Sequence, residues 1–268
     1  MGIQALYSAA AGMTALQTKL DVIANNLANT ETTGFKGERA NFEDLLYRQE
    51  KLPGAEANSG QYTATGIAVG LGSRIASTQT DLTQGTLQQT NRPLDVAIEG
   101  NGFFQITDPS GQIFYTRAGN FSVNSNGAFV MGSATMGRLL DPNITIPVDT
   151  TAIVISDTGK VSVQQPNNTQ LNQVGQIQLA TFINPQGLLA LGGNLYAQTE
   201  SSGAPQQNTP GTNGVGTLQQ NMLEASNVEP VTQLIDLITT QRSFEFNSQA
   251  INASDQILQL IANLRRQS

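Results

Sequence analysis

The chain has 268 residues, of which 38% are hydrophobic and only 12% are charged, and its formal net charge is −7. A length and an apolar share of this size allow a folded core, so the chain is not disordered throughout. The acidic balance argues against nucleic-acid binding, because that binding draws its affinity from clustered Lys and Arg side chains.

The residue types that carry most enzyme chemistry are missing. The sequence contains no His and no Cys, which removes the usual general base, the usual thiolate nucleophile and two common metal ligands. Asp95 and Glu99 could be read as a glycosidase acid pair, but 20 acidic residues always supply some plausible pair. We therefore expect no enzyme activity, no catalytic residue, no cofactor and no metal. We also expect no membrane span, since the apolar clusters are shorter than the roughly 18 residues required.

Residues 3–28 are predicted to form an amphipathic helix. Apolar residues alternate three and four positions apart, which places them in one narrow stripe, as in a coiled coil. We call this set the N-terminal seam: Leu6, Ala9, Met13, Leu16, Leu20, Ile23 and Leu27. The helix should end near residues 25–29, where Asn residues and Gly34 tolerate left-handed backbone angles. The alternative is that this stripe packs against the chain's own domain.

The middle of the chain changes to a β pattern. Residues 31–75 are predicted to be an extended linker, with few large apolar groups around Pro53 and Gly54. In residues 76–226, short apolar runs are separated by turn signals such as Asp108-Pro109-Ser110-Gly111 and Asn126-Gly127. This spacing favours antiparallel hairpins in a sandwich or a distorted barrel.

A second, longer helix is predicted from Asn227, as its N-cap, to about Arg266. Apolar residues at intervals of seven, with others beside them, form the C-terminal seam: Leu234, Leu237, Ile238, Phe244, Ile251, Leu258 and Ile261. A helix of roughly 55 Å, at about 1.5 Å per residue, requires an equally long partner. The N-terminal helix is the partner within the chain.

These elements predict an α+β fold. The terminal helices, within residues 1–30 and 227–268, are expected to pair as a coiled coil beside a central antiparallel β-rich domain. Two paired ends leave outward faces that only other copies of the chain can cover. Because an isolated helical hairpin is marginal, we expect the ends to become ordered on assembly.

Several segments together resemble the family of flagellar rod and hook proteins. The first follows the N-terminal helix and comprises Asn25, Asn26, Leu27 and Asn29, then Gly34, Phe35 and Lys36. Residues 95–104 and 115–121 are similar to the central β segment of the family, and residues 226–245 resemble its C-terminal helix. The likeness covers nearly the whole chain.

The resemblance implies a subunit that assembles helically with copies of itself into a straight, rigid rod and transmits torque. Residues 47–66 resemble an insertion found in subunits of the distal rod. The implied partners are proximal rod proteins, the hook protein, ring bushing proteins and the flagellar type III export apparatus. The implied location is the periplasm-spanning rod of the basal body, reached without a cleaved signal peptide.

Two alternatives remain open at this point. One is a hook or proximal-rod subunit of the same family, and the other is a secreted carbohydrate-active β domain with oligomerisation helices. Residues 128–140 look longer than usual for the family, and the sequence assigns them no role.

Overall fold

The computed structural model describes residues 2–52, 56–58, 61–62, 65–132, 137–166 and 170–267, which form two compact units. The helical unit comprises Met1–Ala28, Glu38–Gln79 and Glu229–Ser268, and the β unit comprises Asn29–Gly37 and Thr80–Val228. The expected α+β class, with a helix at each end and an antiparallel β-rich domain between them, is confirmed.

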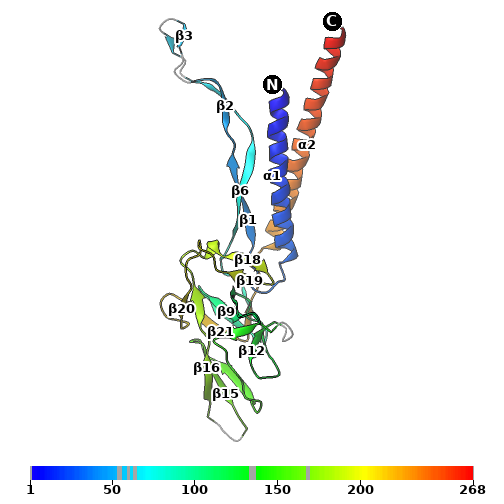
Figure 1. Cartoon of the computed structure of the whole chain (residues 1–268). Helices are drawn as coiled ribbons and strands as arrows, with labels where there is room; N and C mark the ends of the chain where they lie inside the picture. The colour runs from blue at the N-terminus through cyan, green and yellow to red at the C-terminus, as the bar shows by residue number, and fades with distance from the viewer. Residues whose placement is uncertain are drawn as a thin grey trace. The chain divides into compact units, whose positions relative to one another are not determined.

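The helical unit contains two antiparallel helices, α1 (Gly2–Ala28) and α2 (Pro230–Gln267) (Figure 1). Asn26 near the end of α1 bonds to Gln233 near the start of α2, at 3.3 Å. Further along, Gly12 faces Asn247, since a Cβ built on Gly12 would lie 3.4 Å from the Asn247 amide nitrogen. In the described residues, neither helix is long and apolar enough to cross a membrane.

Helix α2 starts later than the sequence predicted. Its first residue is Pro230, a residue type favoured in the first turn because it has no N–H to satisfy. Asn227 is therefore not the N-cap. Its side chain is engaged in the β unit, where it accepts from the Gly37 amide at 2.8 Å and donates to the Asp81 carbonyl at 2.8 Å.

The helical unit also contains a long antiparallel hairpin, which lies along α1 (Figure 1). Its strand pairs are β1 (Glu38–Asp44) with β6 (Ser73–Thr80), β2 (Tyr47–Lys51) with β5 (Ile67–Gly70), and β3 (Glu56–Asn58) with β4 (Gln61–Tyr62). Ser8 of α1 donates to the Gly70 carbonyl at 3.4 Å. The predicted loop around Pro53 and Gly54 lies outside the described residues.

The largest sheet of the β unit has nine strands. Seven run in the order β11 (Phe121–Val123), β12 (Phe129–Met131), β13 (Leu139–Asp141), β9 (Phe103–Thr107), β10 (Ile113–Thr116), β19 (Leu195–Ala197) and β18 (Leu189–Gly192). Strand β17 (Leu179–Thr181) also pairs with β9 and carries β20 (Gln206–Asn208) on its other side. A 3-10 turn spans Pro185–Gly187. The stretch 128–140 supplies β12 and the start of β13, and residues 133–136 lie outside the described residues.

Smaller sheets complete the β unit. One contains β14 (Ala152–Ile155), β15 (Lys160–Gln164) and β16 (Asn172–Gln176). Two pairs join β8 (Val96–Glu99) to β21 (Thr217–Gln220) and β7 (Leu87–Gln89) to β22 (Met222–Glu224). The predicted turns at Gly111 and Gly127 are confirmed, since both residues have positive φ and both amides close a turn.

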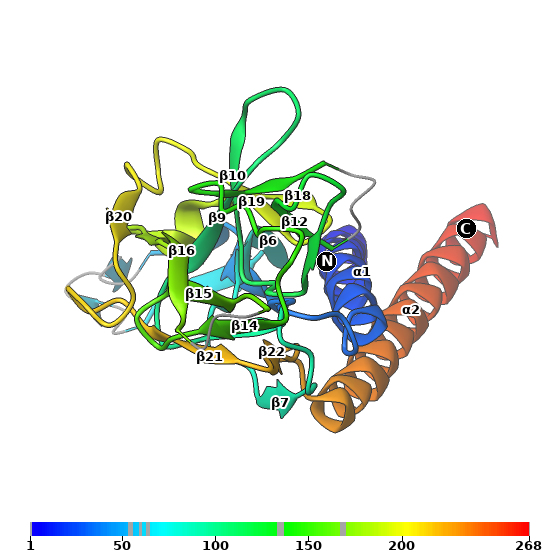
Figure 2. The same cartoon turned by 90° about the horizontal axis from the view of Figure 1, so that it is seen from below.

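The core of the β unit lies inside a curved half-barrel (Figure 2). Strands from every sheet of the β unit except the β7–β22 pair contribute buried apolar side chains to it. Phe121 is 1% exposed and makes edge-on ring contacts to Phe104 at 5.0 Å and to Phe129 at 6.2 Å between centroids. A smaller apolar cluster joins Phe103, Tyr115, Ala180 and Tyr196. The half-barrel agrees with the expected antiparallel architecture.

Candidate functional site

The N-terminal seam lies along one side of α1 and is partly covered. Ile23 is buried at 4% exposed. The other six seam residues are half-buried: Leu6, Ala9, Met13, Leu16, Leu20 and Leu27. The residues that the sequence placed in one stripe therefore share a partly covered face.

The structure divides the C-terminal seam into two sets. Leu237, Phe244, Ile251 and Leu258, which recur at intervals of seven, are half-buried. Leu234 and Ile238, by contrast, are 44% and 51% exposed and lie off this face. The side chain of Ile261 lies outside the described residues. The face toward α1 also carries polar side chains, including the buried Thr240 at 1% exposed.

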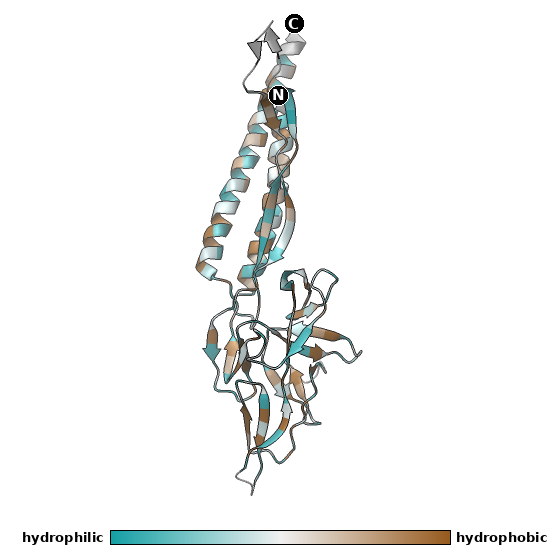
Figure 3. Ribbon diagram, turned by 90° about the vertical axis from the view of Figure 1, so that its left-hand side faces the viewer, coloured by the Kyte–Doolittle hydropathy of each residue, from teal (hydrophilic) through white to brown (hydrophobic). Residues whose placement is uncertain are grey.

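Helix α2 has a second apolar stripe, which the sequence analysis missed. Its members are each more than half exposed: Val231, Ile235, Ile238, Phe246, Ile257 and Leu260. At 100° per residue they lie on the side of α2 opposite the half-buried set. We call them the outer stripe. Figure 3 shows apolar positions recurring along both helices. The spacing of four and then three from Val231 to Ile235 to Ile238 was the signal that could have revealed it.

The family-like motif starts in the last turns of α1 and contains a buried amide side chain. Asn26 is 3% exposed; its Nδ2 donates to the Glu38 carbonyl at 2.7 Å, and its Oδ1 accepts from the Glu38 amide at 2.9 Å. This side chain reproduces the paired hydrogen bonds of a strand and fixes the start of β1. Asn25, Leu27 and Asn29 also have interaction partners, and Asn29 Oδ1 accepts from the Thr32 hydroxyl at 3.1 Å.

Gly34 lies where a side chain has no room. Its φ is +68°, and an added Cβ would lie 2.8 Å from the Ala118 amide nitrogen. The Gly34 amide donates to the Glu224 carbonyl at 2.8 Å. Glycine is needed here both for the backbone angle and for the close approach. Phe35 follows, half-buried, with its amide bonded to the Thr32 carbonyl at 3.2 Å.

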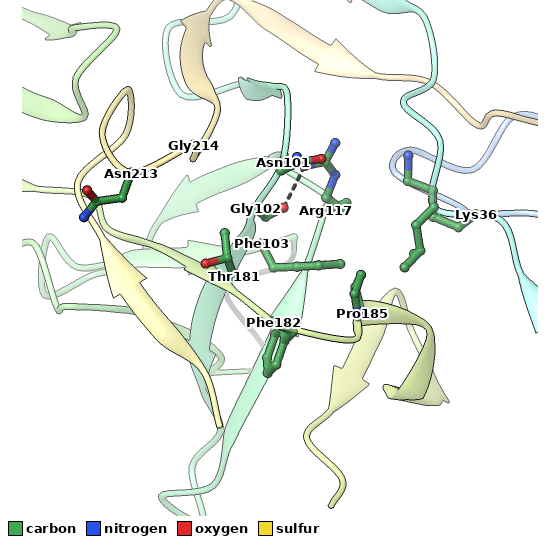
Figure 4. Close-up of a pocket in the computed structure, with 11 residues that line it drawn as sticks. Lys36, Asn101, Gly102, Phe103, Arg117, Thr181, Phe182, Pro185, Asn213 and Gly214 are labelled. Carbon is green, nitrogen blue, oxygen red and sulfur yellow. Dashed lines mark hydrogen bonds between the residues drawn. The ribbon is translucent and has the colours of Figure 1, made fainter. Parts of the chain in front are cut away.

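Lys36 ends the motif in a buried ion cluster of the β unit. Lys36 Nζ donates to Glu224 Oε1 at 2.6 Å and to the Thr83 carbonyl at 2.7 Å. Arg117 Nε lies 3.1 Å from Glu224 Oε2 as an ion pair, without the alignment of a hydrogen bond. Arg117 Nη1 donates to the Gly102 carbonyl at 2.6 Å (Figure 4). The three charged side chains are no more than 5% exposed.

The carboxylate of Glu224 thus neutralises the charges of both Lys36 and Arg117. Burial lowers the pKa of Lys36 below its ordinary 10.5, and the attraction of Glu224 offsets only part of this effect. Burial likewise lowers the pKa of Arg117, again opposed by Glu224. The cluster joins segments far apart in the sequence, since Lys36 and Glu224 are 188 positions apart. It therefore fastens the residues after α1 to the last strand before α2 within the β unit.

A depression of about 340 Å³ lies beside this cluster (Figure 4). Leu82, Phe103, Phe182 and Pro185 give it apolar walls, and its remaining lining residues are Lys36, Asn101, Gly102, Arg117, Thr181, Asn213 and Gly214. None of these lining residues is a carboxylic acid, so the depression has no carboxylate pair. Over the described ranges, no three His, Cys, Asp or Glu side chains gather as a metal site.

Three family models match the chain. They are described as "Flagella basal body rod protein" (residues 6–36), "Flagellar hook protein FlgE/F/G D1 domain" (residues 97–163) and "Flagellar basal body rod FlgEFG protein C-terminal" (residues 219–264). The matches include the seam of α1, the central strands and most of α2.

Full-length relatives were also found. Flagellar basal-body rod protein FlgG of Caulobacter vibrioides is 46% identical over 264 residues, which cover 98% of this chain and 100% of the relative. The protein of the same name from Borreliella burgdorferi is 43% identical over 267 residues, covering 99% and 100%. That of Buchnera aphidicola subsp. Baizongia pistaciae is 42% identical over 262 residues, covering 98% and 100%. The likeness therefore extends from one helix through the β unit to the other.

Proposed function

Because the chain belongs to the family of flagellar basal-body rod proteins, we propose that it polymerises with copies of itself into the distal part of the rod. It is a structural subunit of that rod. Its relatives are named as rod proteins, which does not favour the alternatives of a hook subunit or a secreted carbohydrate-active domain.

The main reason to propose self-assembly is the exposed outer stripe of α2. Its six apolar side chains are each more than half exposed in the single chain. Burying one such side chain completely contributes roughly 1.5–3 kcal/mol. A second copy packed against the stripe would bury these side chains and gain part of that free energy. A contact between different faces of two copies generates a helical polymer when the rotation from one copy to the next does not close a ring.

We include in this proposal that α1 and α2 pair as a coiled coil. The half-buried residues of α2 at intervals of seven face the seam of α1, and this spacing is typical of such pairing. The polar residues among them, such as Thr240 and Asn247, would fix the register of the two helices. The paired helices would form the inner wall of the tube.

The subunit would also have a defined place in the rod and defined neighbours there. The hairpin of β1, β2, β5 and β6 would fill gaps between copies and stiffen the tube, which would pass torque from the proximal rod to the hook. Ring bushing proteins would surround the tube in the periplasm, and the flagellar type III apparatus would export the subunit. The family membership supports this placement.

The test is polymerisation of the purified protein with charges placed on the outer stripe. The variant carries Ile235→Asp and Ile257→Asp together, which would bury two unpaired carboxylates at the proposed contact. We expect electron microscopy to show no tubes, or tubes at least about tenfold shorter, at a concentration where the unaltered protein polymerises. Circular dichroism checks that the variant remains folded.

The matched control is Asn252→Asp. This residue is exposed on α2 and lies between the two apolar faces, so the substitution adds a charge away from both. We expect it to leave tube formation unchanged. Normal tubes from the Ile235→Asp and Ile257→Asp protein would contradict the proposed contact.

A further inference from the structure

A depression of about 390 Å³ lies between α1 and the hairpin of the helical unit. Four small side chains of α1 form one wall and two larger apolar side chains of the hairpin form another: Ala11, Thr14, Ala15 and Thr18, then Leu45 and Ile75. The hairpin backbone comes close to α1 beside this wall, where a Cβ built on Gly72 would lie 3.1 Å from the Ser8 carbonyl oxygen. The small side chains of α1 therefore leave a space next to this contact that the chain itself does not fill.

The lining of the depression suits an apolar group. Thr14 and Thr18 are exposed, so the depression opens to solvent. Their hydroxyls donate to the carbonyls of Ala10 and Thr14 within α1, at 3.1 Å and 3.3 Å, so neither hydroxyl needs a partner in the depression. A cavity of about 150 Å³ with apolar walls is large enough to bind benzene. A space of 390 Å³ therefore accommodates a phenyl ring.

The outer stripe of α2 contains one such ring. Phe246 is the largest member of the stripe and is 67% exposed. Because the stripe lies on the side of α2 away from α1, Phe246 does not reach the depression of its own chain. A second copy of the chain can bring the ring to it.

The charges around the two surfaces are complementary. At the depression, Arg74 also contributes to the lining and forms an exposed ion pair with Glu43. On α2, Arg242 precedes Phe246 by about one turn and Glu245 is its neighbour in sequence, and both are exposed. Each charge of the ion pair can thus face an opposite charge when the ring enters, which favours this pairing of surfaces over others.

We propose that Phe246 of one copy inserts into this depression of the next copy. The inference rests on the self-assembly proposed above and supplies the second face of the outer-stripe contact. The two surfaces lie on different sides of the helical unit, so each copy presents its ring to one neighbour and its depression to another, as a contact between different faces requires. Buried aromatic side chains of this kind contribute a large share of the binding free energy at protein interfaces. The ring also fixes the register in which α2 of one copy lies along α1 of the next.

The first experiment measures the lowest protein concentration at which tubes appear in electron micrographs. Phe246→Ala removes the ring, and Thr18→Trp fills the depression with a ring of its own. We expect each to raise this concentration at least about tenfold, while circular dichroism shows an unchanged fold. Gln17→Trp is the matched control, because this residue of α1 is exposed and does not line the depression, and it should leave the concentration unchanged. Unchanged concentrations for Phe246→Ala and Thr18→Trp overturn the inference.

Cross-linking tests the contact directly, because the chain contains no Cys. Thr14→Cys places a thiol in the depression, and Gln249→Cys places one on α2 about one turn beyond Phe246. Tubes mixed from these two proteins and treated with a short bis-maleimide should yield a covalent pair, whereas Gln256→Cys, about three turns from Phe246, should not. Absence of the pair from tubes that form normally overturns the inference and leaves the proposed self-assembly standing. Failure of the unaltered protein to form tubes overturns both.

Discussion

At the scale of single residues, Glu224 is the side chain that joins the residues after α1 to the last strand before α2 within the β unit. It is 0% exposed, and it neutralises Lys36 on one side and Arg117 on the other. Its Oε1 also accepts from the Gly85 amide at 2.9 Å, and its backbone carbonyl accepts from Gly34. Removing its charge leaves two buried cations without a counter-ion, which costs far more than losing a surface ion pair.

We therefore expect Glu224→Gln to lower the free energy of unfolding by about 3 kcal/mol, the cost of leaving a buried charge unpaired. Urea unfolding followed by circular dichroism measures this change. Glu99→Gln, at the exposed end of β8, removes one negative charge from the same unit and should change stability by less than about 0.5 kcal/mol. Equal effects of the two substitutions would show that the cluster contributes little.

Lys36 gives the cluster a dependence on pH. Because burial lowers the pKa of Lys36 below 10.5, the unfolded chain retains a proton that the folded chain has lost, in the window between the lowered value and 10.5. Stability rises with pH wherever the unfolded state binds more protons. We expect the unaltered protein to gain stability relative to Lys36→Met as the pH rises through this window.

Urea unfolding of both proteins at a series of alkaline pH values checks this expectation. Lys160→Met, at the exposed start of β15, serves as the control and should keep a constant stability difference from the unaltered protein over the same range. A constant difference for Lys36→Met as well would mean that burial does not disfavour the Lys36 ammonium.

Sequence patterns identified some of these residues but not their partners. The motif around Gly34 and Lys36 was visible because its residue types recur in a family, and a positive φ could be expected of that glycine. Glu224 gave no signal, because a lone acidic residue near a turn is ordinary in sequence. Its importance comes from burial beside residues 188 positions away, which only the closed fold produces.

At the scale of elements, the hairpin of the helical unit presents apolar side chains to solvent. Leu46, Tyr47 and Ile67 are 83%, 55% and 53% exposed. The sequence marked residues 47–66 as an insertion, and the pairing of β2 with β5 continues it to Gly70. At the base of this part, the Leu71 amide donates to the Leu46 carbonyl at 3.2 Å. That closing pair is suited to a two-residue turn.

Replacing residues 47–70 with Asn-Gly should shorten the hairpin without disturbing β1 and β6. The two residues would close a type I′ turn on the existing bond between Leu46 and Leu71. Since the side chains of residues 47–52 and 67–69 are exposed, we expect the monomer to unfold at an unchanged midpoint. We expect its polymer to be bent or flexible in electron micrographs. Straight, stiff tubes would show that this segment does not stiffen the rod.

The helices illustrate what periodicity can and cannot predict. Intervals of seven predicted both seams. In α1, however, Ala15 and Val22 are 4% and 9% exposed and lie outside the seam. Leu234 and Ile238 were placed in the C-terminal seam as apolar neighbours of the residues at intervals of seven, although both are exposed. A helix with two apolar faces gives overlapping periodic signals, and sequence alone does not divide such residues between an internal partner and an external one.

At the scale of the whole molecule, the chain combines a β unit with its own core and a helical unit whose apolar surface is incompletely covered. The β unit encloses Phe104, Phe121 and Phe129, each at most 1% exposed. In the helical unit, most seam residues are half-buried and the outer stripe is more than half exposed. An antiparallel class and hairpin turns were predictable, but the strand order was not, because it depends on pairings distant in sequence.

This contrast predicts that the two units differ in stability before assembly. Two helices that bury few side chains completely gain little beyond the entropy cost of ordering them. In dilute monomer, we expect the amides of residues 6–27 to exchange with solvent at least about 100-fold faster than those of β9, because local opening there requires little free energy. In the polymer, where other copies cover the helices, both sets should be protected. Hydrogen exchange read by mass spectrometry measures both states, and the Ile235→Asp and Ile257→Asp protein supplies the monomer at a concentration where it forms no tubes. If residues 6–27 of that monomer are protected as strongly as β9, the helices are stable without neighbours, and assembly does not order them.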